Sequence, residues 1–127
     1  MISTTEFKQA VSDAGPFNVG WVKFSVRFEK SINQDGDECL GVTSFDDLKI
    51  TVKDVKNVKT MRATLLHECW HALLSTFGVK HHDEDETVPL NFTNEYITEQ
   101  CARASILAPA LNPELWELLT NEEYYIE

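Results

Sequence analysis

The sequence predicts an α+β fold in which an N-terminal helix, a three-stranded and mostly antiparallel sheet, and three further helices follow one another along the chain. Two patterns support this prediction. Apolar and polar residues alternate in segments between residues 19 and 53, as they do in half-buried strands. Apolar residues recur at helical spacing before and after that region. With 127 residues, 43% of them hydrophobic, the chain fits a single domain, residues 1–127, with one modest core.

The N-terminal helix is predicted to run from about residue 4 to Ala14. Ser3 and Glu6 have the spacing of a capping box, in which each residue satisfies a backbone N–H of the other. Gly15 and Pro16 follow directly, and this pair ends a helical pattern. The first element is therefore a short helix with a defined start and stop.

Three segments have the alternation of strands. The first begins at Val19 and places apolar side chains at every second position, namely Val22, Phe24, Val26 and Phe28. Residues 39–43 follow a turn at Asp35 and Gly36 and are long enough to return antiparallel. Residues 48–53 alternate again and predict a third strand with one face open to water. At a sheet edge, this third strand can pair its free backbone groups with an extended peptide.

A mostly buried helix is predicted over residues 61–77, because apolar residues there recur at i, i+3, i+4 and i+7. Gly78 ends this pattern as a left-handed cap would. Asp54 or Asn57, a few residues upstream, is expected to cap the N-terminus of the helix.

Two more helices are predicted after a charged segment. Residues 81–86 are the most charged stretch and are expected to form an exposed loop. Thr93 caps a helix that runs to about Ala110. Asn112 and Pro113 open the last helix, with Asn as the cap and Pro at the first helical position.

Composition disfavours several classes of partner. Eleven Lys and Arg residues against 21 Asp and Glu leave a formal net charge of −10, which repels nucleic acid at long range. No apolar run approaches the roughly 20 residues that span a bilayer, and the first residues have neither the basic start nor the apolar segment of a signal peptide. We therefore expect a cytoplasmic protein without a nucleic-acid or membrane partner. Cys39, Cys69 and Cys101 are expected to be reduced thiols.

The segment His67-Glu68-Cys69-Trp70-His71 carries the clearest chemical signal. On a helix, His67 and His71 lie on one face a turn apart, and two neutral imidazoles there can bind one Zn²⁺. Glu68, about 100° further round the helix, is placed to take a proton from an attacking water. This is the HExxH arrangement of zinc-dependent peptidases. The sequence thus predicts a zinc endopeptidase with Glu68 as general base, acting on a protein or peptide substrate.

A third zinc ligand has to come from elsewhere, since catalytic zinc usually has three protein ligands. The metzincin pattern would require Gly and His at positions occupied by Leu74 and Phe77, so that class is excluded. Glu95 and Glu99 remain as candidates, because they lie one turn apart on a separate predicted helix. The residues alone leave open which of the two binds the metal.

A family resemblance bears on that choice. His67 to His71, followed by Asn94-Glu95-Tyr96-Ile97-Thr98-Glu99, resembles the gluzincin peptidases, whose second motif reads Asn-Glu-x-x-Ser-Asp. The resemblance implies a zincin-like scaffold over residues 48–110, with Glu95 as a zinc ligand and Glu99 supporting a zinc-binding His. The small size also resembles the compact ImmA/IrrE-type metallopeptidases of phages and mobile elements. That likeness implies a narrow intracellular protein target, which lies in the host cytoplasm if the chain is phage-encoded.

Two questions stay open from the sequence. Five residues can stabilise an oxyanion: His81, His82, Tyr96, Tyr124 and Tyr125. The alternative to an enzyme is an acidic binding or inhibitor protein whose zinc site is structural or vestigial. Such a site would be closed by a fourth protein ligand, for example Cys39 or His81.

Overall fold

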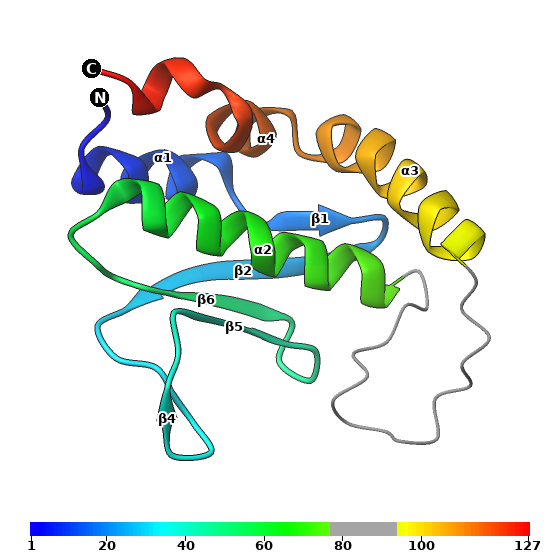
Figure 1. Cartoon of the computed structure of the whole chain (residues 1–127), viewed down its shortest axis with the longest axis horizontal. Helices are drawn as coiled ribbons and strands as arrows, with labels where there is room; N and C mark the ends of the chain where they lie inside the picture. Colours follow the sequence, from blue (N-terminus) through cyan, green and yellow to red (C-terminus); the bar gives the residue numbers. More distant parts are fainter. Residues whose placement is uncertain (77–93) are drawn as a thin grey trace.

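The computed structural model describes residues 1–76 and 94–127, apart from the side chains of Asn94 and Glu95. In that part of the chain the helices are α1 (Thr4–Ala14), α2 (Val58–Thr76), α3 (Asn94–Leu111), α4 (Pro113–Thr120) and the short 3₁₀ helix η1 (Glu122–Tyr125). The strands are β1 (Phe17–Val19), β2 (Val22–Glu29), β3 (Asn33–Gln34), β4 (Asp37–Glu38), β5 (Gly41–Ser44) and β6 (Lys49–Lys53). The predicted α+β class is confirmed, with helices at both ends of a strand-rich region (Figure 1).

The main sheet is mixed and has the strand order β1-β2-β6-β5. β1 pairs antiparallel with β2, β2 pairs parallel with β6, and β5 pairs antiparallel with β6. Most strand pairs are antiparallel, as predicted, but the predicted three-stranded sheet was wrong in two respects. The segment expected as one strand is split in two by a turn at Gly20, whose φ is 64°. The segment expected to return antiparallel, β5, pairs with β6 and not with β2, and β3 and β4 form a separate small hairpin.

β6 does not have the edge position at which it could pair with an extended peptide. It lies between two neighbours, so its backbone groups are used within the sheet and it is not an edge strand. Ile50 and Val52 are fully buried on one face, and Thr51 on the other face is 7% exposed. The expected open face is therefore wrong at Thr51. The edge next to α2, the helix that carries His67 and His71, is formed by β5.

One face of the sheet packs against the helices. α2 contacts both β5 and β6, α1 contacts β2, and α3 contacts α2 and β1 (Figure 1). Buried apolar side chains from these elements form a single cluster that includes Phe7, Phe24, Ile50, Leu65 and Leu119. None of the described helices is long and apolar enough to cross a lipid bilayer.

The helix boundaries follow from side-chain caps. The capping box of α1 is confirmed, because the Glu6 N–H donates to Ser3 Oγ at 3.1 Å and the Ser3 N–H donates to Glu6 Oε1 at 3.0 Å. Asn57 caps α2, since its Oδ1 accepts from the N–H groups of Lys59 and Thr60. Asp54, the other cap candidate, accepts from Lys8 Nζ at 2.8 Å instead. Helix α2 begins at Val58, three residues before the predicted start.

The C-terminal helices begin and end nearly as predicted, but the role of Asn112 differs. Its side chain makes no cap hydrogen bond; instead Oδ1 accepts from Asn18 N–H at 2.6 Å, and Nδ2 donates to Asn18 O at 2.8 Å. This pair of bonds satisfies β1 backbone groups that a further strand would otherwise have to satisfy. The proposed caps Gly78 and Thr93, and the charged segment 81–86, lie outside the described residues.

Candidate metal centre

Helix α2 presents its two imidazoles on the face that points away from the core. Met61, Leu65, Cys69 and Leu73 recur at i and i+4 and are completely buried. The side chain of His67, in contrast, is 66% exposed. The same helical periodicity that buries one stripe of side chains therefore leaves His67 and His71 one turn apart on the outer face.

The two imidazoles converge on one point. Their Nε2 atoms are 2.9 Å apart, and their rings lie at 81° with centroids 4.5 Å apart. At that distance one Nε2 donates to the other, and the donor depends on the tautomer. Two nitrogens that bind the same tetrahedral zinc at 2.0–2.1 Å stand about 3.3 Å apart. A small opening of the pair would thus let both lone pairs bind one ion.

Glu68 lies beside this pair but is held from the opposite direction. Its side chain is only 8% exposed, and its Oε2 atom is 4.0 Å from His67 Nε2. Oε1 accepts a 2.7 Å hydrogen bond from the hydroxyl of Thr43 on β5. The same hydroxyl oxygen is 3.2 Å from the Glu68 carbonyl oxygen, so Thr43 contacts both ends of the residue. One carboxylate oxygen is therefore fixed by the sheet, while the other faces the histidines.

Gly41 allows β5 to approach α2 this closely. A Cβ at Gly41 would lie 2.6 Å from Thr64 Cγ2, 3.1 Å from Glu68 Cγ and 3.3 Å from Glu68 Oε2. Only a residue without a side chain fits at the first of these distances. The backbone of β5 is thus in direct contact with side chains of α2 at the candidate site.

An open groove of about 400 Å³ runs along this contact. It is lined by Leu40 and Gly41 from the β5 side and by Ala63, Thr64, His67 and Glu68 from α2. His67 and Glu68 are therefore accessible from the same side as the strand edge.

Among the described residues, His67, Glu68 and His71 form a group whose ligand atoms all lie within 4.8 Å of one another. Carboxylate and imidazole groups at this separation are a donor set that fits zinc. The sequence-predicted residues His67, Glu68 and His71 are thus brought together as expected.

The other predicted ligands are placed less fully. The backbone of Glu95 lies in the first turn of α3, a helix that packs against α2, but its side chain is outside the described residues. The Glu99 carboxylate accepts a 2.7 Å bond from Arg103, and its side chain is 56% exposed. The assignment of the third ligand stays a prediction.

The candidate oxyanion stabilisers fall into three groups. His81 and His82 lie outside the described residues. Tyr125 is buried in the core, where its hydroxyl donates to Leu118 O at 2.6 Å, so this hydroxyl already has its partner. Tyr96 and Tyr124 remain as candidates in the described region.

The cysteines are all free thiols. Cys69 is completely buried, and burial raises the pKa of its thiol. Cys39, a possible fourth ligand from the sequence, is not in the group formed by the two histidines and Glu68, and its Sγ lies 3.6 Å from Asp37 O.

Thr43 and Gly41 were missed by the sequence reasoning. A glycine inside a strand signals close approach of another element, so Gly41 carried a usable signal. The hydroxyl of Thr43 carried no such signal, because its contact with Glu68 depends on the pairing of β5 with β6.

Comparison of the chain with family models, curated proteins and solved structures finds no match.

Proposed function

We propose that the chain is a zinc-dependent endopeptidase with its active site on the outer face of α2. A single observation supports this most strongly. Two imidazole Nε2 atoms lie 2.9 Å apart beside a carboxylate that is 4.0 Å from one of them and is buried on its other side. Two paired histidines of purely structural use have no need for this third group.

His67 and His71 would hold the ion through Nε2. Zinc bound there supplies Lewis-acid chemistry, which polarises a peptide carbonyl and makes a water nucleophilic near neutral pH. Glu68 accepts the proton of the attacking water and later gives it to the leaving amine. Thr43 holds Glu68 Oε1 at 2.7 Å, which orients Oε2 toward the histidines. The base is thus positioned by the sheet before substrate arrives.

Glu95 is the proposed third ligand, and Glu99 its alternative or a supporting group. The packing of α3 against α2 supports a ligand from the first turn of α3. The ion pair of Glu99 with Arg103 favours Glu95, because binding zinc through Glu99 would require breaking that pair.

The substrate would lie in the groove beside β5 as an extended peptide. β5 is the last strand of the described sheet and pairs only with β6 in that part of the chain. Its outer backbone groups can therefore hydrogen-bond to a substrate strand, and the groove leads from Leu40 and Gly41 to His67. A protein or peptide substrate fits this arrangement.

The test combines metal content with cleavage. Purified wild-type protein should retain zinc near one equivalent, and His71→Ala should lose most of it. Incubated with a proteome-derived peptide library, the zinc-loaded wild type should generate new N-termini that Glu68→Gln does not. Glu114→Gln, a neutralised exposed carboxylate on α4, is the matched control and should cleave like the wild type.

The outcomes separate the two function classes. Wild-type protein that binds no zinc overturns the metal site itself. Zinc binding without any Glu68-dependent cleavage overturns the enzyme and leaves a binding or inhibitor protein with a structural metal.

A further inference from the structure

Half of strand β2 has an uncovered edge. On the side opposite β6, β1 pairs only with Val22–Phe24, and no other described strand continues this row. Burial changes at that point: Phe24, under β1, is 1% exposed, whereas Val26 and Phe28 beyond it are only half-buried. Ile50 and Val52, with which they pair on β6, are fully buried. The apolar face of β2 is thus incomplete where β1 ends.

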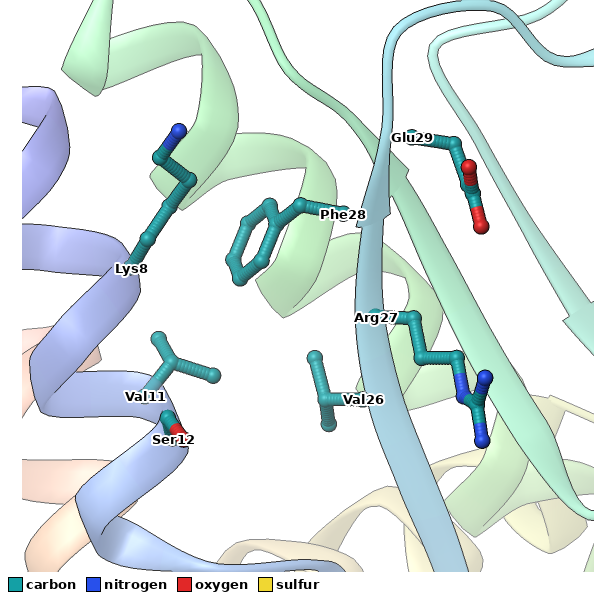
Figure 2. A pocket seen from close by; sticks show the side chains of 7 residues that line it. All are labelled: Lys8, Val11, Ser12, Val26, Arg27, Phe28 and Glu29. Atoms are coloured by element: carbon teal, nitrogen blue, oxygen red, sulfur yellow. The ribbon is translucent and has the colours of Figure 1, made fainter.

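A hollow of about 370 Å³ lies along this edge, between β2 and α1. Figure 2 shows Val26 and Phe28 pointing from β2 toward Lys8, Val11 and Ser12 of α1. Arg27 and Glu29 project from the other face of the strand. The hollow is therefore apolar at its floor and follows the line that a further strand would take.

The backbone of this edge has free hydrogen-bonding groups. Ser25 N–H donates to Leu48 O at 3.0 Å, and Glu29 O accepts from Asp54 N–H at 2.7 Å, so the odd-numbered residues direct their groups toward β6. Successive residues of a strand point in opposite directions within the sheet. The N–H and C=O groups of Val26 and Phe28 therefore point into the open edge.

Arg27 and Glu29 carry opposite charges two positions apart on this edge. Both are exposed, and neither side chain makes a hydrogen bond or ion pair with the described residues. Two such strands placed antiparallel, with Phe28 opposite Phe28, set each Arg27 across from the partner's Glu29. This pattern is complementary to itself.

We propose that β2 is a dimerisation edge, at which a second copy of the chain adds its own β2 antiparallel to form one continuous sheet. The Phe28 residues exchange their N–H and C=O groups across a two-fold axis, and the hollow beside α1 receives the partner's Phe28. A closed, isologous contact of this kind uses the same surface on both copies. It also covers the sheet edge, which natural proteins seldom leave open.

The charges select this register over its neighbour. Sliding the strands so that Arg27 faces the partner's Arg27 places like charges directly opposite each other, which destabilises a strand pair. The register centred on Phe28 gains two opposite-charge pairs instead, by symmetry. The net charge of −10 on each copy opposes association, and salt at about 0.15 M screens that repulsion beyond about 8 Å.

Sedimentation equilibrium of the full chain at this salt concentration tests the proposal. Wild type should show a monomer–dimer equilibrium, with a dimer of twice 14.5 kDa. Arg27→Glu or Glu29→Arg alone turns both attractive pairs repulsive and should weaken the dimer at least about 10-fold. The double exchange of both residues restores opposite charges and should bring the dimer back.

Lys23→Glu is the matched control. It makes the same charge change on the same face of β2, but at a position where β1 covers the edge, so the dimer should persist. Amide exchange should show Phe28 more protected as protein concentration rises. A monomer at all concentrations, or a dimer that neither single reversal weakens, overturns the proposal.

Discussion

Gly41→Ala probes the contact between strand β5 and helix α2. The added Cβ would lie 2.6 Å from Thr64 Cγ2, about 0.8 Å inside the 3.4 Å at which ordinary contact begins. Thr64 cannot easily rotate away, because a β-branched side chain in a helix has few rotamers and its hydroxyl donates to Thr60 O at 2.8 Å. β5 must therefore shift outward. We expect a loss of about 1–3 kcal/mol in unfolding free energy, measured by urea denaturation.

The same experiment in a second background isolates the cause. Thr64→Ser deletes only Cγ2 and keeps the hydroxyl that bonds Thr60. In that background Gly41→Ala should cost at least about 1 kcal/mol less, because the closest clash has gone. The tight approach to Glu68 Cγ, at 3.1 Å, would account for the cost that remains. An equal cost in both backgrounds would refute the steric argument, as would no cost in the wild type.

Two further predictions concern the hydroxyl groups of Thr43 and Tyr125. Thr43→Val removes the donor to the buried Glu68 carboxylate and should cost about 1.5–3 kcal/mol in urea unfolding, whereas Thr43→Ser should retain most of the stability; equal losses would contradict the hydrogen bond's role. Burial raises the pKa of Tyr125 from 10.0 to about 12. The stability that this shift gives the folded state is therefore complete below pH 10 and is lost as pH rises through 12. A shift of two pKa units corresponds to about 2–3 kcal/mol of unfolding free energy. Followed by thermal unfolding, the wild type should lose this stability between pH 9 and 12, and Tyr125→Phe should not show that loss.

The sequence predicted the helices well because their signals are local. The Ser3 capping box, the Asn57 cap and the Pro113 start each depend on residues within one turn, and the structure begins its helices there. The sheet was predicted less well, since alternation shows that a segment is a strand but not which strand it pairs with. The parallel pairing of β2 with β6 depends on contacts between residues more than twenty positions apart.

The candidate site divides in the same way. His67, Glu68 and His71 come from one helix, so their spacing alone placed them together. Thr43 reaches Glu68 only because β5 lies at the sheet edge beside α2, which no local pattern encodes. Asn112 had a clear capping signal, yet its amide bonds the backbone of Asn18, a contact 94 residues away that no local pattern encodes.

The link between Asn18 and Asn112 also affects the order in which the chain folds. It joins positions 94 residues apart, and the entropy of closing so long a loop is lost before its contacts stabilise anything. The turn between β5 and β6, and helix α2, close over short distances and can form early. β1 pairs with β2 across the short turn at Gly20, so only its other edge, where Asn112 binds the backbone of Asn18, should close last. Pulse-labelled hydrogen exchange during refolding would then protect α2 before the Asn18 amide, and early protection of that amide would show that the long loop closes first.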